Sequence, residues 1–205
     1  MAQLFVISAP SGTGKTSLID KVLEEKLAAK TKLGVSCTTR MRRKNEKEGV
    51  AYFFVDEDTF YKKLDEGDFL EYAKVFGNLY GTPKDWVVEN ISQGFDVVLE
   101  LDVQGAIQVK NAYPEAKTIF IIPPSYKDLK KRLIDRDQDS NESIENRLSE
   151  AKQEVISGKD FDHLITNDNF DLAFEDLKSV MYSNSDLDKE RQALTKKCLS
   201  HLLDQ

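Results

Sequence analysis

The sequence predicts an α/β fold, in which helices cover both faces of a mostly parallel sheet, and three observations lead to this prediction. Apolar runs of strand length alternate with segments of helical apolar spacing along most of the 205 residues, as in parallel sheets with crossover helices. Residues 36–93 interrupt this alternation with short alternating strands, which indicates an inserted antiparallel lobe. A pair of basic helices at residues 125–157 indicates a second segment that extends outside the core.

The composition argues against several classes of protein. The 205 residues are long enough to bury a sizeable core, and the 40% of hydrophobic residues is ordinary for a globular chain. The net charge of −7 argues against a general nucleic-acid or membrane-surface binder. Cys37 and Cys198 are far apart and fit no metal-ligand spacing, so we expect free thiols in a reducing cytoplasm. We expect neither a signal peptide nor a membrane span, since the apolar runs are only as long as strands.

The first expected strand, Leu4–Ala9, leads directly into a loop with candidate ligand-binding residues. Residues 10–16 read PSGTGKT, and helical apolar spacing follows. A glycine-rich turn that ends in Lys-Thr, between a strand and a helix, is the layout of a phosphate-binding loop. Backbone N–H groups would hold a triphosphate, Lys15 would reach its β- and γ-phosphates, and the Thr16 hydroxyl would bind Mg²⁺. Ala9 stands where the usual pattern has Gly, which leaves a chance Gly-Lys-Thr turn as the alternative.

The elements on either side of residue 36 are short. The helix after the phosphate loop is expected to run to about Ala29. Strands are expected at Lys32–Ser36 and Ala51–Val55. The polar, Arg-rich stretch Cys37–Gly49 lies between them, and we expect it to stay out of the core.

The second half of the lobe has clear start and stop signals. Asp56 opens a helix with acidic residues in its first turn. The alternating segment Phe69–Val75 predicts a strand. Thr82 is expected to be an N-cap, with Pro83 at the first helical position. Glycines are expected in turns or at helix ends at four positions: Gly67, Gly77, Gly81 and Gly94.

The rest of the chain returns to the alternation of strands and helices. Three apolar segments predict further core strands: Phe95–Leu101, Lys117–Ile122 and His163–Thr166. Four segments with helical spacing follow or separate them: Val103–Ala112, Ser125–Arg136, Glu142–Ser157 and the tail Leu172–Leu203.

Candidate binding residues gather at the expected carboxyl ends of the strands, where open α/β sheets bind ligands. Arg40, Arg42 and Arg43 follow such a strand and have hydroxyls and Tyr52 near them in sequence. Guanidinium, hydroxyl and phenol donors together can clamp a phosphate dianion. The alternative is a solvated charged face.

Two carboxylates are further candidates. Glu71 on the alternating strand could accept the N1 and N2 hydrogens of guanine, a pair that adenine does not offer; a surface residue is the alternative. Asp102 ends an apolar strand, and an acid there commonly holds Mg²⁺ or its water, or orients an Arg. Glu100 points to the same side, and sequence does not separate their roles.

The basic helices supply a third set of candidates. Arg132 and Arg136 lie on one helix face, and Arg147 lies on the next helix. They form either a solvated surface or a lid that brings guanidinium groups to a transferring phosphoryl group. No hydrolytic triad is seen in the sequence, which suits transfer to an acceptor oxygen that is already anionic.

Two motifs in this chain resemble those of the guanylate kinase family. Residues 8–16 read SAPSGTGKT and match its phosphate loop, in which Ala or Gly is accepted at the position of Ala9. Residues 36–54 read SCTTRMRRKNEKEGVAYFF and match its long Ser-x-Thr-Thr-Arg signature. Asn45 replaces a Gly of that signature, and Asn tolerates a left-handed backbone, so we expect the turn to form. The resemblance extends from Leu4 to about Phe174.

The resemblance implies a P-loop nucleotide kinase that converts ATP and GMP to ADP and GDP. It implies ATP-binding residues at Ala9, Pro10, Ser11, Gly12, Thr13, Gly14, Lys15, Thr16 and Asn167. It implies GMP-binding residues at Ser36, Arg40, Arg43, Tyr52, Glu71, Tyr80, Thr82 and Asp102. The implied catalytic residues are Lys15, Arg132, Arg136 and Arg147, and the resemblance places Asp102 near the base or as a brace for Arg40. The expected metal ligand is the hydroxyl of Thr16, with Asp102 as a second candidate from its position at the end of a strand.

The resemblance also implies the organisation of the chain as one domain, residues 1–205. Its expected core comprises 1–35, 94–124 and 158–205, with a GMP-binding lobe at 36–93 and a lid at 125–157. The expected cofactor is Mg²⁺ bound with ATP, and dGMP is a further candidate substrate. We expect no nucleic-acid or membrane partner, a cytoplasmic location, and a monomer or homodimer. The tail beyond about Asp186 matches nothing that we can assign.

Two alternatives to this interpretation have sequence tests. A catalytically inactive guanylate kinase-like module would bind protein instead, but such modules typically have a degraded phosphate loop, whereas Gly12, Gly14, Lys15 and Thr16 are intact here. A kinase for another base is the second alternative, and Glu71 argues for guanine.

Overall fold

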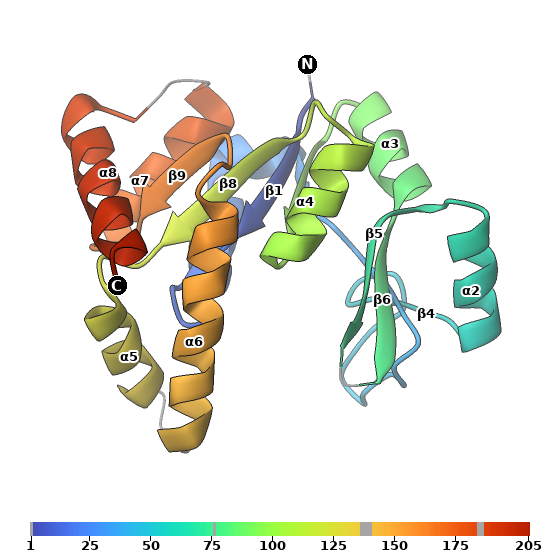
Figure 1. The fold of residues 1–205 in the computed structure, drawn as a ribbon. Coiled ribbons are helices and arrows are strands. Elements are labelled where there is room, and N and C mark those ends of the chain that lie inside the picture. The colour runs from blue at the N-terminus through green and yellow to red at the C-terminus, as the bar shows by residue number, and fades with distance from the viewer. Residues whose placement is uncertain (1, 76, 136–140, 184–186) are drawn as a thin grey trace. The chain divides into compact units, whose positions relative to one another are not determined.

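A computed structural model describes residues 2–75, 77–135, 141–183 and 187–205, and it has the predicted α/β fold (Figure 1). The chain forms two compact units. Unit 1 comprises residues 1–6 and 30–117, and unit 2 comprises residues 7–29 and 118–205. Strand β1 (Leu4–Ser8) therefore contributes to both units, and each unit is described by itself.

The core strands of unit 1 follow the order β2-β7-β1. Strand β2 (Thr31–Leu33) pairs in parallel with β7 (Asp96–Glu100), from Thr31 opposite Asp96 to Leu33 opposite Val98. The backbone N–H of Val97 donates to the carbonyl of Gln3, just before β1, at 2.9 Å. Parallel strands are buried on both faces, which explains the unbroken apolar run in β7.

A second sheet in unit 1 forms the predicted lobe, with the strand order β4-β3-β6-β5. Its pairings are antiparallel except that β3 runs parallel to β4, so the prediction of a purely antiparallel lobe is wrong at that edge. The chain between these strands makes a long return, so β4 enters the sheet in the direction of β3. The strand bounds are β3 Cys37–Thr38, β4 Phe53–Phe54, β5 Phe69–Val75 and β6 Asn78–Pro83.

The Arg-rich stretch does not stay out of the core at its start. Cys37 is 3% exposed and Thr38 is 0% exposed, because β3 lies between two other strands of the sheet. Cys37 packs with Phe60 and Leu79 in the small apolar core of the lobe. Only the part of the stretch after β3 behaves as the sequence predicted.

Two expectations about β6 are also wrong. Gly81 was expected in a turn but lies within the strand, paired with Cys37 and Tyr72. A Cβ there would lie 2.9 Å from the ring of Phe69, so close packing requires the glycine. Thr82 and Pro83 end the same strand, and Pro83 is the N-cap of the next helix. Pairing with β5 continues as far as Pro83 and delays the helix by one residue.

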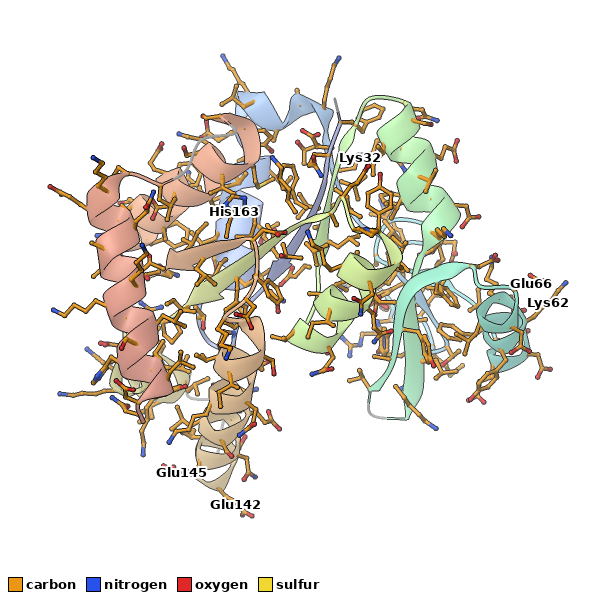
Figure 2. The ribbon with its side chains drawn as sticks, turned by 45° about the horizontal axis from the view of Figure 1, so that its top comes forward. Lys32, Lys62, Glu66, Glu142, Glu145 and His163 are labelled. Atoms are coloured by element: carbon orange, nitrogen blue, oxygen red, sulfur yellow. The ribbon has the colours of Figure 1, made fainter. Side chains whose placement is uncertain are left out.

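The helices of unit 1 begin where their sequence signals predict or one residue later. Asp56 caps α2 by accepting from the backbone N–H of Thr59 at 2.8 Å. Lys62 in the last turn of this helix and Glu66, its C-cap, are exposed and form an ion pair at 4.0 Å (Figure 2). The helix bounds are α2 Glu57–Asp65, α3 Lys84–Ser92 and α4 Val103–Ala112.

Unit 2 contains the strand order β1-β8-β9. Strand β8 (Lys117–Ile122) pairs in parallel with β9 (His163–Thr166), from Ile119 opposite His163 to Ile122 opposite Thr166. Its helices are α1 Lys15–Leu23, the 3₁₀ helix η1 Lys26–Lys30, α5 Tyr126–Asp135, α6 Asn141–Gly158, α7 Phe170–Lys178, the π-helix η2 Ser179–Ser183 and α8 Lys189–Leu203.

Two elements near the N-terminus are shorter than predicted. Helix α1 ends at Leu23 rather than near Ala29, because its last turn tightens into the 3₁₀ pattern, with the N–H of Glu25 bonded to the carbonyl of Val22. Strand β2 ends at Leu33, which leaves Ser36 in a loop.

Both cysteines are buried free thiols. Within the part of the chain that the structure describes, no helix combines the length and the apolar character needed to cross a membrane.

We predict that Gly158→Ala destabilises the protein, although alanine normally stabilises a helix relative to glycine. A Cβ at this last residue of α6 would lie 2.7 Å from the buried ring of Phe120. Overpacking of this kind costs about 1–3 kcal/mol. Denaturant unfolding would measure the loss, with the exposed neighbour substitution Ser157→Ala as the control. A Gly158→Ala protein as stable as the control would contradict the packing.

Candidate functional site

The phosphate loop lies between β1 and α1, entirely in unit 2. Its two glycines adopt left-handed backbones, with φ of 89° at Gly12 and 100° at Gly14. A Cβ would lie 2.7 Å from a methyl of Leu133 at Gly12, and 2.8 Å from the side-chain amide of Asn167 at Gly14. Both positions therefore require glycine for backbone conformation and for space.

The loop delivers Lys15 and Thr16 to the first two positions of α1. Gly14, the N-cap, has no side chain that could accept from the N–H groups of the first turn. A helix N-terminus without a side-chain cap favours an anion, because its N–H groups and dipole present positive charge.

The carbonyl oxygen of Thr13 anchors the loop to two other elements. It accepts from Nδ2 of Asn167 at 2.7 Å and from Nη1 of Arg132 at 3.2 Å. Nη2 of Arg132 in turn donates to the carbonyl of Asn167 at 2.7 Å. The structure therefore brings Asn167 and Arg132, predicted from distant parts of the sequence, to the phosphate loop.

A pocket of about 400 Å³ opens beside this anchor. Its lining comes from the loop, the start of α1, the end of α5, the residue after β9 and the start of α7: Gly12, Thr13, Gly14, Ser17, Arg132, Asp135, Asn167 and Phe170. Its size and its position at a helix N-terminus suit the phosphates of a nucleotide.

The structure describes one of the other two predicted lid arginines. Arg147 lies on α6 and is half-buried. Arg136 lies outside the described residues.

A second cluster of polar side chains lies in unit 1, around Arg40. Its guanidinium donates to both carboxylate oxygens of Glu46, at 2.7 and 3.1 Å, and lies over the ring of Tyr52 at 5.3 Å. The rings of Tyr52 and Tyr80 meet edge to face at 5.9 Å. Hydrogen bonding to Glu46, with a smaller contribution from Tyr80, raises the pKa of Arg40. Three residues predicted to hold a phosphate therefore lie together.

Glu46 organises this cluster, and the sequence reasoning gave it no role. Besides Arg40, its carboxylate accepts from the backbone N–H of Arg43 at 2.8 Å. The hydrogen bond from Arg40 is the main cause that lowers the pKa of Glu46. The same turn closes as expected despite Asn45, since the N–H of Glu46 donates to the carbonyl of Arg43 at 3.1 Å. The position of Glu46 within the Arg-rich signature of residues 36–54 was the sequence feature that could have indicated this role.

Glu71 is a buried carboxylate, 6% exposed, on β5. Its Oε1 accepts from the hydroxyl of Thr82 at 2.6 Å. A Cβ at Gly105 would lie 3.3 Å from Oε2 of Glu71 and 3.4 Å from Oδ1 of Asp102, so the two carboxylates approach the same spot. Burial raises the pKa of Glu71; the hydrogen bond from Thr82 opposes this rise, and the charge of Asp102 adds to it.

The structure separates Asp102 from Glu100. Asp102 is the N-cap of α4 and accepts from the N–H of Gly105 at 2.7 Å, whereas Arg40 pairs with Glu46 instead. Glu100 lines a pocket of about 190 Å³, whose polar lining also includes Ser36, Tyr52 and Thr82.

A hydroxyl of the phosphate loop, that of Thr16, is a candidate ligand for a metal ion. Within the described ranges, no group of three or more His, Cys, Asp or Glu side chains could hold a metal ion. Mg²⁺ usually keeps several waters and binds through phosphates and one or two protein oxygens, so a hydroxyl such as that of Thr16 suffices.

Comparison with known proteins identifies relatives over almost the whole chain. A family model described as guanylate kinase matches residues 1–184. The chain is 51% identical over 179 residues to the guanylate kinase of Hahella chejuensis, covering 87% of this chain and 85% of that protein. It is 45% identical over 202 residues to that of Coxiella burnetii, covering 98% and 95%. A crystal structure of guanylate kinase from Anaplasma phagocytophilum matches with a TM-score of 0.67 and 30% identity, over 93% of this chain and 89% of that one.

We predict that Glu71→Gln raises the stability of the protein at neutral pH. A carboxyl whose pKa is raised on folding holds its proton more tightly in the folded state, so stability falls as pH rises from the unfolded-state pKa through the folded-state pKa. Glutamine stays neutral and can still accept from Thr82. Thermal unfolding between pH 4 and 8 would show a higher midpoint for the variant at neutral pH and a narrowing difference as pH falls.

The control for this prediction is Glu66→Gln, at the exposed C-cap of α2. An exposed substitution should change stability by no more than about 0.5 kcal/mol. A difference between wild type and Glu71→Gln that widens toward acid pH would contradict the burial argument.

Proposed function

The chain belongs to the guanylate kinase family and transfers the γ-phosphoryl group of ATP to GMP, and from this premise we propose which residues bind each nucleotide. One observation supports the proposal most strongly: each unit carries its own polar site. Unit 2 has the anchored phosphate loop, and unit 1 has the buried Glu71–Thr82 pair together with the Arg40 cluster.

We assign ATP to the loop Ala9–Thr16. Its backbone N–H groups and the N-terminus of α1 would hold the phosphates, and Lys15 would neutralise the charge that develops between the β- and γ-phosphates. Asn167 is a candidate for the adenine contact: its Nδ2 donates to Thr13, and its Oδ1 is the atom that could accept from the adenine amine.

We assign the guanine of GMP to Glu71, Ser36 and Thr82. A carboxylate has about four lone-pair positions, so Glu71 can accept from Thr82 and still receive the N1 and N2 hydrogens of guanine. Because Glu71 is buried, water would compete poorly for these bonds.

The GMP phosphate would bind at Arg40, Arg43, Tyr52 and Tyr80. Glu46 holds the guanidinium of Arg40 against the ring of Tyr52, which fixes a donor in place before the phosphate arrives. Asp102 belongs to the guanine part of the proposed GMP site, because its carboxylate lies close to that of Glu71.

The transfer itself requires positioning and charge neutralisation rather than a general base, because the acceptor phosphate oxygen is already anionic. Arg132 contacts the phosphate loop through Thr13, which supports its role beside the transferring group. Arg136 and Arg147 complete the proposed set of lid arginines.

The proposed cofactor is Mg²⁺, which would neutralise phosphate charge when it is bound with ATP. The Thr16 hydroxyl is the proposed protein ligand, with Asp102 as a second candidate. Asp102 uses one carboxylate oxygen as the cap of α4.

The proposal also assigns a role to each part of the chain and a cellular setting to the enzyme. We propose that residues 36–93 act as the GMP-binding lobe, 125–157 as the lid, and 1–35, 94–124 and 158–205 as the core. We further propose a cytoplasmic enzyme, with two buried free thiols in support, that acts on GMP and dGMP as a monomer or homodimer without nucleic-acid or membrane partners. No observation favours the inactive protein-binding alternative.

We predict that Lys15→Ala lowers turnover by about 100-fold or more, the usual loss when one donor to the transition state is removed. GMP affinity should stay within about twofold of wild type, because the proposed GMP residues lie in unit 1. A coupled assay and equilibrium GMP binding would measure the two effects. Lys21→Ala, an exposed lysine of the same helix paired with Glu24, is the control. Normal turnover in Lys15→Ala would refute the loop assignment.

We predict that Glu71→Ala weakens GMP binding by about 100-fold, since hydrogen bonds to a charged group contribute about 1.5–3 kcal/mol each. ATP affinity should be unchanged. In the wild type, an assay with ATP against GMP, dGMP, AMP, CMP and UMP should show activity for the guanine nucleotides. Equal losses of GMP and ATP affinity in the variant would remove Glu71 as the reader of the base.

A further inference from the structure

Helix α8 lies beyond residue 184, where the family match ends, yet it packs onto the part of unit 2 that anchors the phosphate loop. Its buried residues are Arg191, Thr195, Cys198 and Leu202, which share one helix face by their spacing. The first two of these side chains make polar contacts to the end of β9. An apolar face would be enough to attach a helix, so the polar residues call for an explanation.

Arg191 is 8% exposed and donates through three different nitrogens. Its Nε donates to Oδ2 of Asp176 at 2.7 Å and its Nη1 to Oδ1 of Asp168 at 2.8 Å. Its Nη2 donates to the carbonyl of Thr166, also at 2.8 Å. The hydroxyls of Thr195 and Thr166 form a further buried hydrogen bond at 3.0 Å. Three of these four hydrogen bonds reach residues 166 and 168, and the fourth reaches Asp176 on α7.

Asn167 lies between these two residues, and its amide anchors the phosphate loop. Its backbone N–H donates to the carbonyl of Ile122 at 2.9 Å, and its side chain reaches Thr13. A Cβ added to Gly14 would lie 2.8 Å from Nδ2 of Asn167, so there is little space between Asn167 and the loop backbone. A small displacement of Asn167 would therefore displace the loop backbone.

The chemistry of Arg191 indicates positioning more than stability. Replacing a buried ion pair with apolar groups is often neutral or stabilising, so attachment of α8 alone does not require a charge. Burial raises the pKa of Asp176, and the hydrogen bond from Arg191 opposes this rise. A planar guanidinium that donates in three fixed directions is well suited to hold a short backbone segment in one conformation.

We propose that Arg191 is a positioning residue of the ATP site, which acts through residues 166–168 to hold the Asn167 amide on the carbonyl of Thr13. The proposal rests on the assignment of ATP to the phosphate loop. It gives the C-terminal helix a role in nucleotide binding.

The test is Arg191→Lys, because lysine keeps the positive charge but cannot donate in three directions. We expect the dissociation constant of Mg²⁺–ATP, measured by calorimetry without GMP, to rise about tenfold, and that of GMP to stay within twofold. The matched control is Leu202→Ala, a buried apolar residue on the same face of α8 but nearer the C-terminal end of the helix than Arg191, and we expect it to lower the melting temperature. The control should leave both affinities within twofold.

A second variant and a direct readout keep the proposal testable if Arg191→Lys folds poorly. Thr195→Val removes only the hydroxyl that contacts Thr166, and we expect a two- to threefold loss of ATP affinity. The side-chain amide resonances of Asn167, observed with ¹⁵N-labelled asparagine, should shift in both variants but not in Leu202→Ala. Unchanged ATP affinity and unchanged Asn167 resonances in a folded variant would overturn the proposal.

Asn167→Ala separates this proposal from the one on which it rests. If Asn167→Ala and Lys15→Ala both weaken ATP binding while Arg191→Lys does not, only the role of Arg191 is wrong. If neither Asn167→Ala nor Lys15→Ala affects ATP binding, the assignment of ATP to the loop fails, and the role of Arg191 fails with it.

Discussion

The carbonyl oxygen of Thr13 is the atom through which the phosphate loop is anchored to the rest of unit 2. The loop around it contains two left-handed glycines, and such a backbone has few conformational restraints of its own. The N–H of Thr13 donates to the carbonyl of Pro10 within the loop, and the hydrogen bonds of Asn167 and Arg132 restrain the loop from outside. Strand β9 and helix α5 thus cooperate to hold a loop that is far from both in sequence. Helix α8 joins them through its contacts on either side of Asn167.

Unit 1 uses carboxylates in two opposite electrostatic settings. Glu46 pairs with Arg40, which lowers its pKa and keeps it charged as a structural partner. Glu71 is buried beside Thr82 and close to Asp102, and its pKa is raised. Within the described part of the chain, no cation contributes to the environment of Glu71. A buried carboxylate in such a setting lowers stability, and a ligand that donates two hydrogens to it would compensate. At Glu71, the proposed contact for guanine, the buried carboxylate would therefore favour GMP binding but lower the stability of the protein without GMP.

The local sequence signals were most accurate where an element depends on its own residues. Strands β5 and β8 and helix α4 have the bounds that their apolar patterns and flanking signals predicted. The errors occur where pairing with a distant strand decides the outcome. Gly81 belongs to a strand because β5 and β3 pair with it, and Cys37 is buried because its strand lies inside a sheet.

The sequence by itself determined the phosphate loop, the Arg-rich signature and the family, because these depend on residue types at fixed short spacings. It also predicted that Arg40, Tyr52 and Tyr80 belong to one site. Only the tertiary structure decided the partner of each charged group: Glu46 for Arg40, the α4 N-terminus for Asp102, and residues 166–168 for Arg191. The hydrogen bonds of Arg191 span 15 to 25 residues that no sequence period relates, so they arise only when the chain has folded. Those of Arg40 and Asp102 are local, and there the folded loop and helix decide which of several nearby groups becomes the partner.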